Sequence, residues 1–188
     1  MNVVESVKLA LPVIEALEAE DVPYMVVGGI SSSYWGIPRA TKDADIVIKV
    51  ESSAKINALE ARLAGKIKFD PQITFETITG NVRHILRCKG SPFLVELFEL
   101  SADPHNQQRF ARRMVQFVSV LDRKVILPSA EDVIIQKLRW GRSKDLDDAR
   151  DVMAVQDEAL DWSYIEDWCA KHGTLQRMKT VRDSIPPI

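Results

Sequence analysis

The chain has 188 residues, 46% hydrophobic and 28% charged, an ordinary composition for a globular domain with a sizeable core. Its formal net charge of −2 excludes a global basic field, so any nucleic-acid partner must be held by a local patch. Two cysteines exclude a disulfide framework, and no apolar run resembles a membrane span or a secretory signal, so we expect a cytoplasmic location and no membrane partner.

The first predicted element is an amphipathic helix over residues 2–20. Apolar residues recur there near the helical period, from Val4 to Leu17. Pro12 lies inside this range and either kinks the helix or marks its true start. We expect this helix to cover one face of a sheet.

The next stretch predicts a strand, a glycine turn, a short helix, a loop and a second strand. An apolar run from Tyr24 to Val27 stops at Gly28-Gly29, and a second apolar run covers residues 46–48. Glycines let backbone N–H groups approach phosphate oxygens, and the following helix adds its positive N-terminus. Tyr34 and Trp35 on that helix either pack in the core or stack a base.

Two aspartates, Asp43 and Asp45, lead into the second strand. Side chains at i and i+2 of a strand point to the same face, so both carboxylates can share a hard cation. Arg39 and Thr41 precede them in the loop. Arg39 is either a solvated loop residue or a phosphate contact or brace for the carboxylates.

The combination of Val27-Gly28-Gly29 with Asp43-Ala44-Asp45, 14 positions after Gly29, resembles the nucleotidyltransferase superfamily of DNA polymerase β. The resemblance implies an α/β (α+β) fold with a mixed, mostly antiparallel sheet flanked by helices. It also implies Mg²⁺-dependent transfer of NMP from an NTP to a hydroxyl. In that case Asp43 and Asp45 hold two Mg²⁺ ions, and Gly28, Gly29 and Ser31 bind phosphates.

The middle of the chain predicts a helix over residues 52–63 and strands over 72–79, 82–88 and 93–100, the first two joined at Gly80-Asn81. The third strand carries Glu96 and Glu99, and a buried unpaired carboxylate there is costly. The superfamily has a third metal-binding carboxylate on a neighbouring strand, usually Asp. We favour Glu96 for this role; Glu99, which faces the opposite way on a regular strand, is the competitor.

Residues 101–110 predict a loop, and Arg109, Arg112 and Arg113 form a small basic cluster that is either solvated or contacts nucleic acid. Residues 114–121 and 124–127 predict a closing hairpin. A helix then starts at the N-cap Ser129 and ends at Gly141.

The next helix begins with several acids, which the helix macrodipole alone favours. However, Lys137 together with Arg142, Lys144, Asp145 and Asp148 resembles the C-terminal motif of AbiEii-type nucleotidyltransferases of toxin–antitoxin and phage-defence systems. The resemblance implies that Lys137 neutralises triphosphate charge and that Asp145 or Asp148 holds Lys137 or Arg142 in place.

We therefore predict a nucleotidyltransferase core over residues 1–128 and a helical part over 129–188, with helices at 162–171 and 174–182. The resemblance suggests a toxin-type enzyme that acts on the 3′ end of tRNA or on a protein, with a cognate antitoxin or toxin partner. Two alternatives stay open. One is an antibiotic-type enzyme with a small-molecule acceptor; the other is a catalytically silent nucleotide-binding or antitoxin-like partner protein.

Overall fold

A computed structural model describes residues 7–76, 78 and 80–186. In chain order, its elements are η1 (Lys8–Ala10), α2 (Leu11–Ala19), β1 (Tyr24–Val27), α3 (Gly28–Trp35), β2 (Asp43–Ile48), α4 (Ser53–Leu63), β3 (Ile67–Phe69), β4 (Thr74–Phe75), β5 (Val82–Cys88), β6 (Leu94–Glu99), α5 (Pro104–Ala111), β7 (Met114–Val118), β8 (Arg123–Leu127), α6 (Ala130–Trp140), α7 (Ser143–Gln156), η2 (Asp157–Ala159), α8 (Trp162–Lys171) and α9 (Leu175–Asp183).

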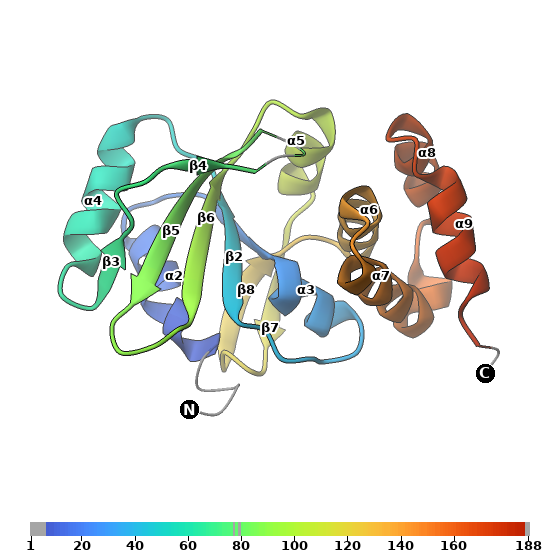
Figure 1. The fold of residues 1–188 in the computed structure, drawn as a ribbon, viewed down its shortest axis with the longest axis horizontal. Coiled ribbons are helices and arrows are strands. Elements are labelled where there is room, and N and C mark those ends of the chain that lie inside the picture. The colour runs from blue at the N-terminus through green and yellow to red at the C-terminus, as the bar shows by residue number, and fades with distance from the viewer. Residues whose placement is uncertain (1–6, 77, 79, 187–188) are drawn as a thin grey trace.

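The main sheet has the strand order β1-β2-β6-β5-β3, with β4 added alongside β5. Strands β2 and β6 are parallel, and the other neighbours in this sheet are antiparallel. Strands β7 and β8 form a separate antiparallel hairpin. The predicted mixed, mostly antiparallel sheet with flanking and C-terminal helices is therefore confirmed (Figure 1). The parallel pair matters most, because it brings the entrances of β2 and β6 to the same end of the sheet.

Alternation along β2 and β6 separates an apolar face from a polar one. Ile46 and Leu97 are fully buried on the first face, where they join a cluster that includes residues of α2 and α4. Truncating either to alanine would cost about 2–5 kcal/mol. The intervening positions, which include Asp45 and Glu96, lie on the opposite face. The core thus fixes the direction in which the carboxylates point.

Helix α5 replaces the loop that we predicted for residues 101–110, so that prediction was wrong. The Asp103 side chain caps the helix by accepting a hydrogen bond from the Asn106 N–H at 3.0 Å, and Pro104 occupies the first turn. Phe110 packs on Met25, Val27 and Val47, which lie on the same face of the sheet as Asp45 and Glu96. Helix α5 therefore covers part of this face and leaves the end near Asp45 open.

The predicted basic cluster at 109–113 is also corrected. Arg109 is only 4% exposed, because it lies on the inner side of α5. The Arg112 guanidinium lies 4.1 Å from the centre of the Tyr164 ring, and that of Arg113 lies 4.0 Å from the Phe110 ring. Arg109 is thus unable to contact a phosphate at the surface.

Helices α6 to α9 enclose a second apolar cluster, whose buried members lie between residues 130 and 181, and Trp35 of α3 packs against it. Ser129 caps α6 by accepting from the Asp132 N–H, and Gly141 ends it with a φ of 67°, as its position after the last turn predicts. This separate cluster supports our proposal that residues 129–188 form a helical part of their own.

Smaller differences concern the ends of elements. Pro12 lies in the first turn of α2, so it marks the start of that helix. Strand β4 covers only two residues of the predicted 72–79, of which Thr77 and Thr79 lie outside the described residues, as do residues 1–6 of the first predicted helix. In the described part of the chain, no helix combines the length and the apolar composition needed to cross a membrane.

Candidate active site

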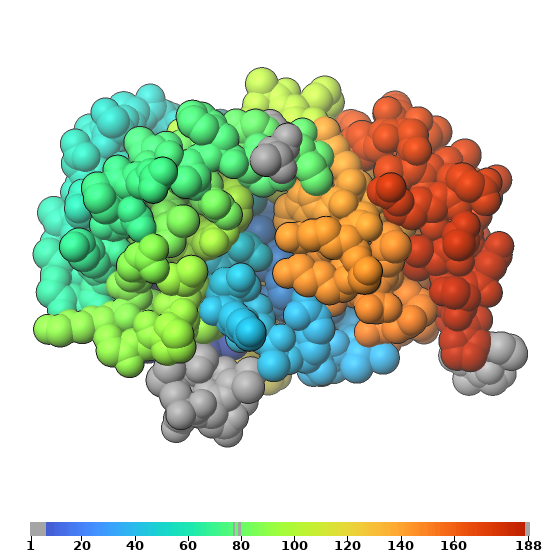
Figure 2. Space-filling model, viewed as in Figure 1, coloured from blue at the N-terminus to red at the C-terminus, as the bar shows by residue number. Residues whose placement is uncertain are grey.

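A pocket of about 710 Å³ opens between the polar face of the sheet and helices α6 and α7. Figure 2 shows this hollow between the green segment that contains β4 and β5 and the orange helices. The pocket is lined by Gly29, Arg39, Ala40, Thr41, Lys42, Asp43, Asp45, Glu76, Ile78, Arg83, Glu96, Phe98, Lys137, Trp140, Arg142 and Lys144.

Three carboxylates face this pocket from the parallel strand pair. Asp45 of β2 and Glu96 of β6 are register partners, and Asp43 lies two residues before Asp45 on the same face. Glu99 lies on the other side of the sheet, where it bonds His84 at 2.7 Å and lines a different pocket. The structure therefore brings Glu96, and not Glu99, to Asp43 and Asp45.

The carboxylate of Asp45 is destabilised in its charged form. Burial, followed by repulsion from Asp43 and Glu96, raises its pKa to about 7, against smaller opposing effects of Lys137 and Lys144. A cation at this point would relieve the repulsion, and carboxylate oxygens are the ligands that Mg²⁺ prefers. The donor chemistry thus fits a divalent cation.

Among the described residues, no group of three or more His, Cys, Asp or Glu side chains is arranged to hold a metal ion. The Glu96 carboxylate instead pairs with Arg83, whose Nη1 lies 3.2 Å from Oε2. To bind a cation, Glu96 would have to share Arg83 with that cation or release it.

The Gly28-Gly29 turn packs tightly against the carboxylate strand. Gly28 has a φ of 64°, and a Cβ there would lie 1.9 Å from Oδ2 of Asp45. A Cβ on Gly29 would lie 2.8 Å from Oγ1 of Thr41. Ser31 does not line the pocket: it is 1% exposed, and its hydroxyl donates to the Gly28 carbonyl at 3.0 Å. The turn thus offers backbone rather than a serine hydroxyl to a ligand.

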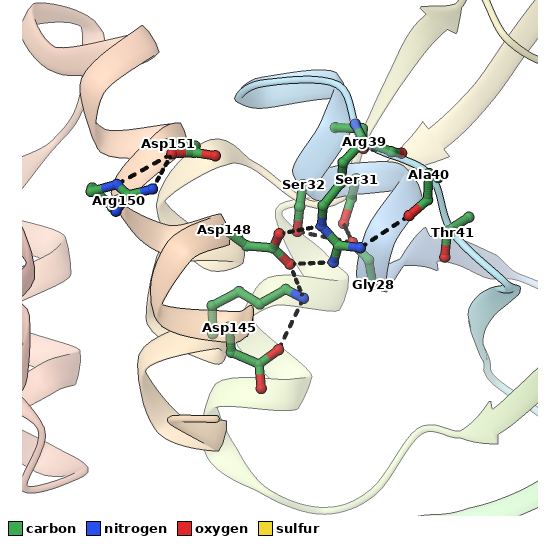
Figure 3. A network of polar contacts seen from close by, with 12 residues as sticks. Gly28, Ser31, Ser32, Arg39, Ala40, Thr41, Asp145, Asp148, Arg150 and Asp151 are labelled. Carbon is green, nitrogen blue, oxygen red and sulfur yellow. Dashed lines mark hydrogen bonds and ion pairs between the residues drawn. The ribbon is translucent and has the colours of Figure 1, made fainter. Parts of the chain in front are cut away.

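The loop before β2 connects the aspartates to helix α7. The Thr41 hydroxyl donates to Oδ1 of Asp43 at 3.0 Å, which fixes that carboxylate. Arg39 forms a two-pronged ion pair with Asp148 of α7, with Nε–Oδ1 at 2.5 Å and Nη2–Oδ2 at 2.7 Å (Figure 3). Arg39 thus braces α7 as well as lining the pocket.

Lys137 of α6 lies between two acids of α7. Its Nζ is 2.7 Å from Oδ2 of Asp148 and 3.2 Å from Oδ1 of Asp145, and the residue is 4% exposed. Arg142 in turn bonds Oδ2 of Asp145 at 2.5 Å. Burial alone would raise the pKa of Asp148, but the hydrogen bonds from Arg39 and Lys137 outweigh it and lower that pKa. The five charges, two acidic and three basic, therefore form one network beside the pocket, to which Lys144 adds a further cation.

Sequence reasoning missed several lining residues, above all Arg83, Glu76 and Trp140. Arg83 had a usable signal, because alternation along β5 places it on the face opposite the buried His84 and Leu86. Tyr34 and Trp35 do not line the pocket: they bond Gln116 and the Pro128 carbonyl, so base stacking by them is excluded in this arrangement.

The mixed, mostly antiparallel sheet with its flanking and C-terminal helices defines the class by its fold: the chain has the polymerase β-like nucleotidyltransferase fold. No protein-family model and no curated protein matches the sequence. Solved structures do match. The solution structure of the antibiotic-resistance factor ANT(2″)-Ia matches with a TM-score of 0.60 at 15% identity, over 97% of each chain.

Two further structures are similar. A nucleotidyltransferase-like antigenic protein of Paracoccidioides brasiliensis has a TM-score of 0.58 at 20% identity, over 97% of this chain and 91% of its own. ANT(2″)-Ia in complex with adenylyl-2″-tobramycin has a TM-score of 0.57 at 15% identity, over 89% and 96%. The TM-scores show that the fold is similar to that of nucleotidyltransferases, and at identities this low the similarity is one of fold alone. The resemblance to the AbiEii-type branch rests on sequence motifs.

Proposed function

We propose that the protein is a Mg²⁺-dependent nucleotidyltransferase that moves NMP from an NTP to a hydroxyl. The acceptor oxygen forms a bond to the α-phosphorus, the bond from that phosphorus to the β-phosphate oxygen breaks, pyrophosphate leaves, and the hydroxyl proton passes to solvent. The observation that carries the proposal is the convergence of Asp43, Asp45 and Glu96 on one pocket beside the Gly28-Gly29 turn.

Asp43, Asp45 and Glu96 would hold Mg²⁺, which supplies charge stabilisation at the α-phosphate and lowers the pKa of the hydroxyl. The backbone of the glycine turn and the N-terminus of α3 bind triphosphate oxygens. Lys137, Arg142 and Lys144 add positive charge on the same side. In phosphoryl transfer the protein acts mainly by positioning and electrostatics, and this arrangement provides both.

We infer that the acceptor is a small molecule rather than a tRNA or a protein side chain. ANT(2″)-Ia, whose fold is shared, is an antibiotic-resistance factor seen with adenylylated tobramycin. Arg109, one of the three arginines considered for contact with nucleic acid, is buried and cannot reach an RNA phosphate at the surface. The toxin-type function and its antitoxin partner are left without further support.

Transfer is tested by following label from each α-³²P-NTP into acceptors, with pyrophosphate release as a second readout. We expect Asp43→Asn to lower turnover by about 10³-fold, because one Mg²⁺ ligand is lost, while the fold persists. The matched control is Asp147→Asn on α7, which is 62% exposed and outside the pocket. Normal turnover by Asp43→Asn would overturn the metal assignment.

A catalytically silent module gives a different result. It would bind Mg²⁺ and NTP by calorimetry, with heats that Asp43→Asn removes, but would release no pyrophosphate with any hydroxyl compound tested. Absence of NTP binding with Mg²⁺ would overturn the nucleotide site itself.

A further inference from the structure

Arg83 stands apart from the other basic side chains of the pocket. It comes from β5, and its guanidinium contacts two neighbours: Nε donates to Oγ1 of Thr74 at 2.8 Å, and Nη1 donates to Oε2 of Glu96 at 3.2 Å. Its side chain is 31% exposed. Arg83 is therefore held in place at the wall of the pocket, with a face still open to a ligand.

The position of Arg83 is across the carboxylates from the remaining cations. In the sheet, β5 is separated from β2 by β6, whereas α6 and α7 lie beyond the β2 side, next to α3 (Figure 1). Lys137 and Lys144 come from those helices and Arg142 from the turn between them, whereas Arg39 and Lys42 precede β2. The pocket thus has a basic wall on one side of the carboxylates and Arg83 on the other.

In an in-line displacement, the leaving pyrophosphate and the acceptor hydroxyl occupy opposite sides of the pocket. The attacking and leaving oxygens lie roughly on opposite sides of the α-phosphorus. If pyrophosphate leaves toward the glycine turn and Lys137, the acceptor hydroxyl enters from the β5 side. That side is lined by Arg83, Phe98, Ile78 and Glu76.

Glu96 partly neutralises Arg83 in the structure described. A carboxylate that binds a divalent cation has less negative charge to offer a neighbouring guanidinium, so Arg83 gains affinity for another anion. Its planar fork suits a phosphate or a carboxylate. A cationic group of an acceptor placed near Arg83 would be repelled by like charge. Because Glu76 lines the same wall, a cationic acceptor is the comparison that tests this inference.

We propose that Arg83 binds an anionic group, a phosphate or a carboxylate, on the hydroxyl acceptor. This inference rests on the proposed function and narrows its substrate class. It makes the acceptor chemically unlike tobramycin, although the fold is shared with ANT(2″)-Ia.

The first test does not need the natural acceptor. The protein is saturated with Mg²⁺ and a non-hydrolysable α,β-methylene NTP, and inorganic phosphate is titrated by calorimetry. We expect phosphate to bind to the wild-type complex. Arg83→Gln should lower the phosphate affinity about tenfold, because one charge-assisted hydrogen bond is lost. The control is Arg87→Gln, on the same face of β5, paired with Asp70 and outside the pocket; it should leave phosphate affinity unchanged.

The outcomes separate the two proposals. Binding of the analogue without binding of phosphate, or equal phosphate affinity in Arg83→Gln and wild type, overturns the role of Arg83 and leaves the proposed function standing. Failure of the analogue to bind with Mg²⁺ overturns the proposed function. Binding of the analogue by Arg83→Gln also shows that this variant is folded.

A second test distinguishes the sources of the anion. Label transfer is compared for glucose and glucose 6-phosphate, for tobramycin, and for total tRNA. A preference for glucose 6-phosphate over glucose that disappears in Arg83→Gln supports a small anionic acceptor. If only tRNA is labelled and Arg83→Gln abolishes that labelling, the anionic group is a phosphate of an RNA end. Transfer to tobramycin that is insensitive to Arg83→Gln overturns the inference.

Discussion

Gly28 lies directly against the carboxylate of Asp45, so close that an added Cβ would be 1.9 Å from Oδ2. Its φ of 64° belongs to the left-handed region that glycine adopts without strain. The turn and the carboxylate strand therefore depend on each other: only a residue without a side chain lets the helix α3 start where Asp45 needs space.

Gly28→Ala should displace Asp45 as well as strain the turn. We expect roughly a 10²-fold loss of turnover, the size typical of a misplaced reacting geometry, together with weaker Mg²⁺ binding by calorimetry. The matched control is Gly173→Ala, which has a φ of 68° but no atom within 4 Å of an added Cβ. That variant should lose about 1 kcal/mol of stability and keep its turnover. Equal turnover in the two variants would contradict the contact with Asp45 as the cause.

Lys137→Met should destabilise the fold, because it leaves Asp145 and Asp148 buried with less positive charge. Breaking a buried pair costs about 3–5 kcal/mol, and we expect the lower end because Arg39 and Arg142 still pair with these acids. Urea denaturation measures the change. Lys171→Met, in an exposed pair with Asp167 on α8, is the control and should shift stability by less than about 0.5 kcal/mol.

The buried network also predicts non-additivity. Asp148→Asn should cost less stability in the Lys137→Met background than in wild type, since the contact between Lys137 and Asp148 is already lost there. Strict addition of the two single changes would show that Lys137 and Asp148 do not interact in solution.

The raised pKa of Asp45 makes the stability of the metal-free protein depend on pH. In the folded state the Asp45 carboxyl holds its proton up to about pH 7, whereas in the unfolded chain it loses the proton near the ordinary aspartate pKa of 3.8. The stabilising contribution is therefore complete below about pH 4 and is lost as the pH rises through 7. Asp45→Asn, which carries no charge, should be more stable than wild type by an amount that grows with pH, from about 2 kcal/mol at pH 5 to about 4 kcal/mol at pH 8.

Thermal unfolding in EDTA at pH 5, 6, 7 and 8 measures this difference. Added Mg²⁺ should make wild type the more stable of the two proteins, because the cation binds and stabilises wild type, whereas Asp45→Asn lacks one of its ligands. The exposed Asp147→Asn should show neither the pH trend nor the reversal. A constant difference across the pH range would contradict the buried, repelled carboxylate.

The sequence pattern was sufficient to predict that Asp43, Asp45 and Glu96 lie on one face of the sheet, because local signals and tertiary structure agree there. The run before Gly28, the i, i+2 spacing of Asp43 and Asp45 and the period-2 position of Glu96 each predict a strand feature, and strand alternation sets the face. Lys137 and its acids followed from the motif, although their mutual distances required the packing of α6 on α7.

Other features could not be predicted, because they depend on which hydrogen-bond partners and packing contacts form in the folded chain. The Ser31 hydroxyl bonds the carbonyl of its own first turn, a local alternative that a phosphate-binding pattern does not exclude. Helix α5 had its signals in Asp103 and Pro104, but its polar surface resembled a loop because only one side of it packs on the sheet. Arg83 reaches the site from a strand far from either motif, so only strand pairing reveals its contact with Glu96.

Glu96 and Glu99 provide the sharpest comparison, because they are three residues apart on one strand and face opposite sides of the sheet. Glu96→Gln removes a carboxylate from the pocket that contains Asp43 and Asp45, so we expect turnover to fall about 10²-fold or more and Mg²⁺ affinity to fall with it. Glu99→Gln removes the partner of His84, 2.7 Å away, and should cost about 1 kcal/mol of stability with turnover intact.

Turnover, Mg²⁺ calorimetry and urea denaturation of both variants give the answer. If Glu99→Gln lost turnover while Glu96→Gln kept it, the third carboxylate would belong to the other face, and the register of β6 against β2 could not be the one described. Since a slip of one residue reverses every side chain of a strand, the two variants also test that register in solution.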